Sequence, residues 1–314
     1  MLPANITELR LVTFTLLGIP GFEQFHSIIS VPLFIVFCVS VVGNPLIFFI
    51  ILSDRSLHTP MYVFLSLLAI TDFMFTLSIV PQMLANFWFH SPVVSFGQCL
   101  VQMFFVHFLS YMESGVLVAM AFDRYTAICH PLRYFTILTS AVTSRIGLVL
   151  VLRGVLIISP CFYLIVRLPF CGHKVITNPY CDHMSIAKVS CGDITINSLY
   201  GMIQLILAVI FDISSIVLSY AFIICAVLKL PSKEARSKTF STCSSHVCVI
   251  SLFYIPCAFS LLAYRFGKHI PRSVHSIISL IYLQLPPMMN PVVYGGRTGQ
   301  IRDKICKLLQ RMKQ

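Results

Sequence analysis

The chain has 314 residues, of which 57% are hydrophobic and only 11% are charged, and its mean hydropathy is +0.89. Soluble domains carry about a quarter charged residues, so a soluble chain of this composition would expose large apolar patches and aggregate. The formal net charge of +11 does not indicate a nucleic-acid-binding protein, because membrane proteins concentrate Lys and Arg in cytoplasmic loops. Composition therefore predicts a membrane protein.

A membrane-spanning helix needs about 20 mostly apolar residues, and seven stretches of the chain meet this standard. In chain order they are residues 28–53, 61–89, 96–122, 146–166, 194–228, 239–264 and 273–296. The connections are short apart from residues 167–193, and no internal repeat interrupts the pattern. We therefore expect one all-α domain over residues 1–314, folded as a seven-transmembrane helix bundle.

The Lys and Arg residues outside these stretches orient the bundle. If the N-terminus is outside, the cytoplasmic side holds roughly twice as many of them as the outer side. The sequon at Asn5 agrees, because glycosylation takes place on the lumenal face. We expect residues 1–27 and the loop 167–193 to be extracellular, and residues 297–314 to be cytoplasmic.

Four of the twelve cysteines fall at or beyond the expected outer edge of the membrane: Cys99, Cys171, Cys181 and Cys191. Disulfides persist in that oxidising compartment. Four cysteines allow three pairings, and the spacing alone does not choose among them. The chain contains no Cys-x-x-Cys pair, which argues against a zinc or redox centre.

Two carboxylates lie inside the second and third apolar stretches, Asp72 and Glu113. Charged groups inside a membrane are costly and usually functional. We expect Asn44, Asn290 and a cation or proton as their partners. Two interpretations remain open, a small sodium site and a protonated, hydrogen-bonded structural pair.

Two further charges lie inside the fourth and fifth stretches. We interpret Asp212 as a hydrogen-bonded packing residue, whereas Arg153 needs a partner or must extend toward the membrane surface. Directly after the third stretch, Asp123, Arg124 and Tyr125 stand at a membrane edge. If that edge is cytoplasmic, this arrangement is typical of a signalling receptor and not of a pore or an enzyme.

Other classes of membrane protein lack their expected signals in this sequence. The seventh stretch holds no lysine for a retinal Schiff base. The His-Glu-x-x-His motif of metalloproteases is absent, and no repeat indicates a transporter. Pro256 and Pro291 should instead kink the sixth and seventh helices, which suits a conformational switch.

Motifs spread over the whole chain resemble those of one family. They are Gly43-Asn44, residues 57–72 (LHTPMYVFLSLLAITD), 120–134 (MAFDRYTAICHPLRY), Ser219-Tyr220, 238–246 (KTFSTCSSH) and 287–294 (PMMNPVVY). The chain resembles a rhodopsin-like G-protein-coupled receptor of the odorant-receptor family. Phe122 and the segments 265–267 and 297–302 resemble its class I, or fish-like, branch, and within that branch subfamily fifty-two. Thr126, Gly296 and Gly299 depart from the usual pattern.

The resemblance implies a role for each matching residue. Asp123 should hold Arg124 in the resting state, and Arg124 should move toward Tyr220 and Tyr294 when the sixth helix swings out. The cleft so opened would admit a stimulatory G protein that raises cyclic AMP. The remaining activation residues would be Tyr125, Tyr254, Asn290 and Pro291.

The resemblance further implies the disulfides Cys99–Cys181 and Cys171–Cys191. It also implies a plasma-membrane location, in the cilia of olfactory neurons. Residues 302–313 resemble a basic amphipathic helix that lies on the cytoplasmic surface of the lipid bilayer.

The candidate ligand site centres on Arg265. It lies eleven residues beyond Tyr254, or about 1,100° of helical rotation, so both side chains should face the bundle interior. An inward guanidinium among apolar neighbours suits a carboxylate; the alternative is an end-of-helix charge that reaches to the membrane surface. The other candidate lining residues are His107, Tyr111, Ser114, Met184 and Leu261. His107 is either a ligand contact or a satisfied core histidine.

We therefore predict a receptor for small, carboxylic-acid odorants and not an enzyme. The main alternative is a receptor of the same fold with a non-acid or non-olfactory ligand. A channel or transporter has much less support from the sequence. No cofactor is expected apart from the sodium ion considered above.

Overall fold

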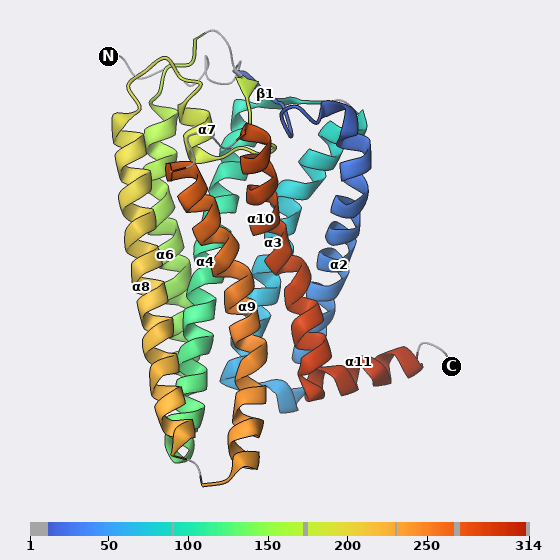
Figure 1. The fold of residues 1–314 in the computed structure, drawn as a ribbon, viewed down its shortest axis with the longest axis vertical. Coiled ribbons are helices and arrows are strands. Elements are labelled where there is room, and N and C mark those ends of the chain that lie inside the picture. The colour runs from blue at the N-terminus through green and yellow to red at the C-terminus, as the bar shows by residue number, and fades with distance from the viewer. Residues whose placement is uncertain (1–11, 90, 172–174, 230, 267–270, 312–314) are drawn as a thin grey trace.

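The structure is a computed structural model that describes residues 12–89, 91–171, 175–229, 231–266 and 271–311. Within these ranges the side chains at positions 235, 238, 241–242, 260–266, 272, 297, 308–309 and 311 are not described. The long helices run side by side as one elongated bundle (Figure 1). They are α2 (His26–Ser53), α3 (Pro60–Phe89), α4 (Phe96–Cys129), α6 (Ser140–Val166), α8 (Thr195–Leu228), α9 (Lys233–Phe266) and α10 (Arg272–Arg297).

The described part of the chain contains 6 helices that are long and apolar enough to cross a membrane, and α9 adds the shorter apolar stretch Cys243–Phe259. Several helices are longer than the apolar stretches that predict them. Helix α6 begins at Ser140, where Thr139 accepts a hydrogen bond from the amide of Val142 at 3.3 Å. Apolarity marks the part of a helix that lies in lipid, whereas capping groups decide where the helix ends.

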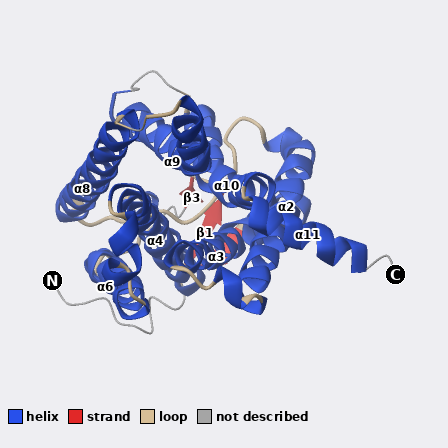
Figure 2. Ribbon diagram, turned by 90° about the horizontal axis from the view of Figure 1, so that it is seen from below, coloured by secondary structure: helices blue, strands red, loops and turns tan. Residues whose placement is uncertain are grey.

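Helix α4 is the central element of the bundle and packs against α3, α6, α8 and α9 (Figure 2). It begins with a capping box, in which Ser95 and Gln98 each accept a hydrogen bond from the other's backbone amide. It continues to Cys129, well past the predicted end at residue 122. Asp123, Arg124 and Tyr125 therefore lie within the helix, which fixes their backbone positions.

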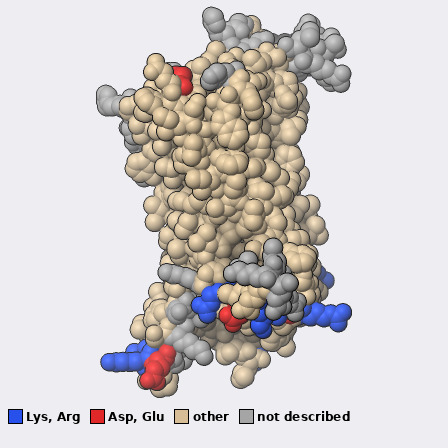
Figure 3. All heavy atoms as spheres, turned by 90° about the vertical axis from the view of Figure 1, so that its right-hand side faces the viewer, with Lys and Arg blue, Asp and Glu red and all other residues tan. Residues whose placement is uncertain are grey.

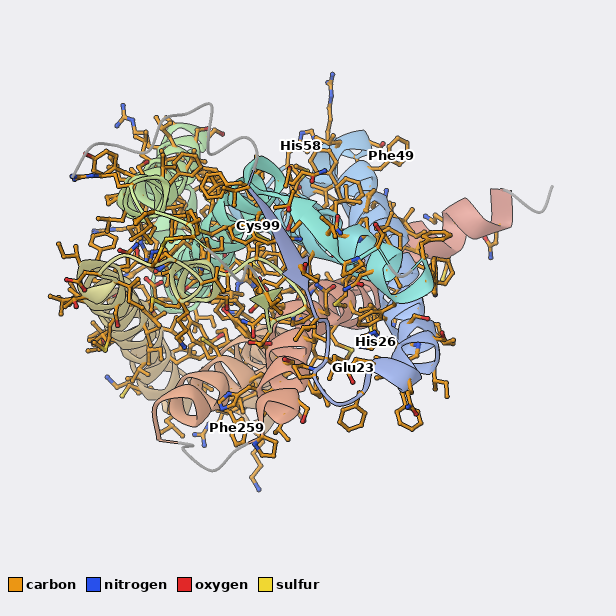
Figure 4. The ribbon with its side chains drawn as sticks, turned by 90° about the horizontal axis from the view of Figure 1, so that it is seen from above. Glu23, His26, Phe49, His58, Cys99 and Phe259 are labelled. Carbon is orange, nitrogen blue, oxygen red and sulfur yellow. A yellow bond between two sulfur atoms is a disulfide. The ribbon has the colours of Figure 1, made fainter. Side chains whose placement is uncertain are left out.

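The three-stranded sheet at one end of the bundle was not expected from the sequence. Strand β1 (Thr13–Leu16) pairs antiparallel with β2 (Val93–Ser95) and parallel with β3 (Val175–Ile176). The buried Phe14 and Leu16 pack with residues of α4 and of the loop 167–193. Viewed from this end, β1 lies across the helices, and Cys99 lies beside it (Figure 4). We call this end of the bundle the loop end.

The opposite end, called here the α11 end, carries the helix α11 (Gly299–Arg311), which projects away from the bundle (Figure 1). Tyr62 donates a hydrogen bond to Gln300 at 2.7 Å, and Lys304 forms an ion pair with Asp54. The hydrogen bond from Lys304 lowers the pKa of Asp54. The sequence predicted this helix over residues 302–313; it begins three residues earlier, and residues 312–314 lie outside the described part.

A close approach between α2 and α10 allows a test of this packing. A Cβ added at Gly43 would lie 2.8 Å from the Cβ of Pro291, whose ring is rigid. We expect Gly43→Ala to cost about 1–3 kcal/mol, because the helices must separate. The thermal half-life of the detergent-solubilised protein measures the effect.

The matched control is Gly147→Ala on α6, where the new Cβ would meet only a side-chain carbon of Leu67 at 3.5 Å, an ordinary contact. This variant should be as stable as the unaltered protein. Equal half-lives for the two variants would show that the α2–α10 contact is not tightly packed.

Candidate functional site

At the loop end, three consecutive loop residues are attached to α4. Cys181 forms a disulfide with Cys99, and its amide donates to the side-chain oxygen of Gln102 at 2.8 Å. Asp182 Oδ1 lies 3.3 Å from His107 Nε2. The amide of His183 lies 3.4 Å from the same nitrogen. The second disulfide, Cys171–Cys191, closes the loop upon itself.

The short helix α7 (His183–Ala187) begins where the loop meets α4. Asp182 Oδ2 caps this helix by accepting from the amides of Met184 at 3.2 Å and Ser185 at 3.4 Å. Burial raises the pKa of Asp182, but the hydrogen bond and charge of His107 outweigh it and lower the value to about 2. Burial lowers the pKa of His183 to about 4. At neutral pH, Asp182 is therefore ionised and His183 is neutral.

His183 is almost fully buried, with 4% of its surface exposed. Its Nε2 has no hydrogen-bond partner within the described residues. The other side of the ring packs near Gly201 of α8, where an added Cβ would meet Nδ1 at 3.3 Å. A buried imidazole nitrogen without a partner is costly unless a ligand or water satisfies it.

The predicted pocket residues are only partly brought together. His107, Tyr111 and Ser114 follow one another at helical spacing along one face of α4. Met184 stands at the start of α7, beside the residues that contact His107. The side chains of Leu261 and Arg265 lie outside the described residues, as does Asn5.

A chain of polar contacts crosses the middle of the bundle. Arg153 Nη2 lies 2.8 Å from Asp212 Oδ2, which also accepts from Ser114 Oγ at 2.6 Å. Because the Ser114 proton is used in this way, the Tyr254 hydroxyl, 2.7 Å away, donates to Ser114. The interpretation of Asp212 as a packing residue is thus incomplete, because it is the counter-ion that Arg153 requires.

The two intramembrane carboxylates, Asp72 on α3 and Glu113 on α4, are both buried. Asp72 Oδ2 accepts from the side-chain amide nitrogen of Asn290 at 2.7 Å. Asn44 donates instead to Ser40 and to the carbonyl of Pro287. Asp72 Oδ1 and Glu113 Oε1 are buried and without a hydrogen-bond partner among the described groups. Unsatisfied oxygens of this kind fit a proton or a small cation with a preference for oxygen ligands.

At the α11 end, Asp123 holds Arg124. The guanidinium contacts Asp123 Oδ2 at 2.6 Å and 3.0 Å, while the Tyr134 hydroxyl donates to Oδ1 at 2.6 Å. Tyr220 instead contacts His246 Nδ1 at 2.7 Å. Burial, followed by the hydrogen bond to Asp123, raises the pKa of Tyr134.

The remaining activation residues surround this arrangement. The hydroxyl of the buried Tyr294 is without a partner in the described part of the chain. Tyr125 contacts His130 Nε2 at 3.2 Å and packs against the ring of Phe222 on α8. Pro291 lies inside α10 and packs against Gly43.

This architecture defines the class of the protein. The fold is similar to that of squid rhodopsin, with a TM-score of 0.73 at 18% identity, covering 94% of this chain and 87% of that one. The bundle is therefore a rhodopsin-like seven-transmembrane bundle, as the sequence predicted.

Sequence comparison gives the family. A family model described as olfactory receptor matches residues 33–312. The human (Homo sapiens) Olfactory receptor 52D1 is 48% identical over 311 residues, 98% of either chain, and Olfactory receptor 52N4 is 47% identical over 314 residues, 100% of this chain and 98% of its own. The chain belongs to the olfactory receptor family, in subfamily 52. It is a multi-pass membrane receptor for small molecules that signals through a G protein, and it is not an enzyme.

The sequence-based hypothesis missed four residues of these sites: Tyr134, Asp182, His183 and His246. The pair Asp182-His183 directly follows Cys181, and this adjacency to a cysteine at the outer edge was the available signal. His246 belongs to a motif that was recognised, but its partner Tyr220 is 26 positions away on another helix.

The buried pair Arg153–Asp212 can be tested by removing its charges singly and together. Arg153→Met leaves the carboxylate of Asp212, 1% exposed, without its counter-ion. We expect a loss of about 3–5 kcal/mol in stability and a corresponding loss of receptor at the cell surface. The double variant Arg153→Met/Asp212→Asn should recover most of that loss, because no uncompensated charge remains. A double variant as poor as Arg153→Met would contradict the pairing.

The arrangement around Asp123 predicts a change in basal activity. Asp123→Asn removes the charge that holds Arg124, and about 1 kcal/mol of lost restraint corresponds to roughly a fivefold larger active population. Tyr134→Phe removes one hydrogen bond only, so we expect a smaller rise. Ligand-free nucleotide exchange on a G protein, normalised to receptor amount, measures both. A ligand-free rate that stays at the wild-type level in Asp123→Asn would refute the restraint.

Proposed function

We propose that this receptor detects small carboxylic acids and activates a stimulatory, olfactory-type G protein that raises cyclic AMP. The observation that supports the acid ligand best is the buried Nε2 of His183, without a partner in the described residues and one residue from the Asp182–His107 contact. A neutral imidazole offers one N–H donor, which a carboxylate oxygen accepts well.

The proposed pocket lies beneath the loop, along the α4 face that carries His107, Tyr111 and Ser114. Helical rotation would put Arg265 on the same side of α9 as Tyr254, and Tyr254 contacts Ser114. The carboxylate would bind Arg265 bidentately at the loop end, and the alkyl chain would extend toward Ser114 and Tyr254. Leu261 and Met184 would contribute apolar contact.

Ligand binding would reach the G-protein side through the contact between Ser114 and Tyr254. This contact joins α4 to α9, the helix that also carries His246, the partner of Tyr220. A displacement of α9 would release Tyr220 toward Arg124. Motion of one helix relative to another between two packed arrangements is a common form of switch.

We infer the orientation of the receptor in the membrane from its charge. On the face drawn in Figure 3, Lys and Arg gather at the α11 end, and a broad belt of uncharged side chains separates them from the loop end. By the positive-inside rule, the α11 end would lie in the cytoplasm. The G protein would then bind beside Arg124, α11 would lie on the lipid surface, and the sequon at Asn5 would be extracellular. Ciliary location in olfactory neurons belongs to the same proposal.

A sodium ion is the proposed occupant of the site between Asp72 and Glu113. Their buried oxygens Oδ1 and Oε1 lack partners in the described chain, and Asn290 has a further buried oxygen in the same condition. Oxygen ligands suit a hard cation. The alternative, in which protons occupy these carboxylates, predicts that receptor stability is independent of sodium concentration.

The acid ligand is tested by replacing Arg265. Cells that express the receptor are exposed to a series of straight-chain carboxylic acids and the corresponding alcohols, and both cyclic AMP and membrane current are recorded. We expect acids to raise cyclic AMP. Arg265→Ala should weaken the acid response at least about tenfold, since a lost charged hydrogen-bond pair exceeds about 1.4 kcal/mol, and it should spare any alcohol response.

Arg167→Ala provides the matched control. Arg167 is another outer arginine, but it stands at the end of α6, and its guanidinium lies 5.3 Å from the ring centroid of Tyr163 on the same helix. It should leave the acid response unchanged at equal surface level. A full acid response in Arg265→Ala would exclude the clamp, and a ligand-dependent current without cyclic AMP would exclude the receptor mechanism.

A further inference from the structure

We propose that Asp182 determines how strongly the receptor discriminates between acids and neutral odorants, because it competes with the ligand carboxylate for His107. The inference rests on the proposed acid site and adds to it a repulsive element. Selectivity built from repulsion against one class of ligand is a general device in recognition.

The carboxylate of Asp182 is held in place from three sides. The preceding residue, Cys181, is fixed to α4 by its disulfide. One oxygen, Oδ2, caps α7 through the amides of Met184 and Ser185. The other, Oδ1, lies 3.3 Å from His107 Nε2. Asp182 therefore cannot turn away when a second anion approaches.

His107 Nε2 cannot satisfy both of its neighbours at once. In the tautomer without hydrogen on Nε2, this atom accepts from the amide of His183, 3.4 Å away. In the tautomer with hydrogen on Nε2, it donates to Asp182 instead. A ligand carboxylate that binds this same N–H must displace Asp182 from it. Both side chains are 26% exposed, so the pair is accessible to a ligand.

A competing negative charge is already in place when the ligand arrives. Without ligand the contact with His107 lowers the pKa of Asp182 to about 2, so an acid meets an ionised carboxylate at the nitrogen that it must bind. Two like charges at one site repel each other more strongly in the low-dielectric interior than in water. A neutral alcohol meets no such repulsion. In the proposed site, the attraction between Arg265 and the ligand carboxylate must therefore exceed the repulsion from Asp182.

Asp182→Asn isolates the charge from the structural role. The amide oxygen of Asn still caps α7, because Asn and Asp are equally good N-cap residues. The matched control is Asp193→Asn. Asp193 lies in the same loop, two residues before α8, and accepts at 2.9 Å from the amide and at 2.6 Å from the hydroxyl of Thr195. Asp182→Glu retains the charge.

The measurement is the half-maximal concentration of each acid and of the alcohol of equal chain length, at matched surface level. We expect Asp182→Asn to lower the acid value about tenfold, equivalent to about 1.4 kcal/mol, and to leave the alcohol value unchanged. Asp193→Asn and Asp182→Glu should retain the wild-type acid value. A merely structural role would move acid and alcohol together.

Failure of this inference differs from failure of the acid site itself. An acid value that is unchanged in Asp182→Asn, or equally lowered in Asp193→Asn, overturns the role of Asp182 while an Arg265-dependent acid response still stands. A wild-type receptor that is silent to every acid overturns the proposed function. In that case an acid response gained in Asp182→Asn supports the inference, and continued silence overturns it.

Discussion

A charged side chain inside a lipid bilayer needs a partner within the protein, and this constraint decides how the bundle is assembled. The central helix α4 supplies or supports many of the contacts. From the loop end to the α11 end, its polar side chains meet the loop, then α8 and α9, and then the segment after its own end. The contacts run through Gln102 and His107, Ser114, and Asp123. Because one helix carries all these side chains, their positions relative to one another are fixed.

The middle contact depends on the ion pair between α6 and α8. The charge of Arg153 compensates that of Asp212. Asp212 can therefore accept a hydrogen bond from Ser114 without remaining an uncompensated charge inside the bundle. Ser114 is then free to accept from Tyr254 on α9. The ion pair between α6 and α8 thereby supports the hydrogen bond through which a ligand would act on α9.

The sequence predicted the seven helices well, because a bilayer imposes a length of apolar chain that is easily recognised. It predicted their ends poorly. The apolar pattern ends at the membrane surface, whereas α4 continues to Cys129 and α6 begins at Ser140. The sheet was missed because its strands have only 2 to 4 residues, and alternation over so short a run is indistinguishable from chance.

The sequence indicated which residues of the candidate site matter, but it did not indicate which residues they contact. Arg153 and Asp212 were each recognised as costly charges, yet they are 59 positions apart and on different helices. Asn290 was correctly expected beside Asp72, because both belong to membrane-embedded motifs, whereas Asn44 bonds to backbone instead. Pairings that depend on helix rotation are not contained in a local pattern.

In the proposed acid site, neighbouring groups at the loop end would have opposite effects on the ligand. His107 and His183 would donate to its carboxylate, whereas the charge of Asp182, 3.3 Å from His107 Nε2, would oppose it. Attraction alone would bind every anion of suitable size, and repulsion alone would reject them all. With both kinds of group at one disulfide-anchored segment, recognition would depend on the difference between them. An acid would bind only where the proposed contact with Arg265 and the apolar fit of its chain together exceed the repulsion from Asp182.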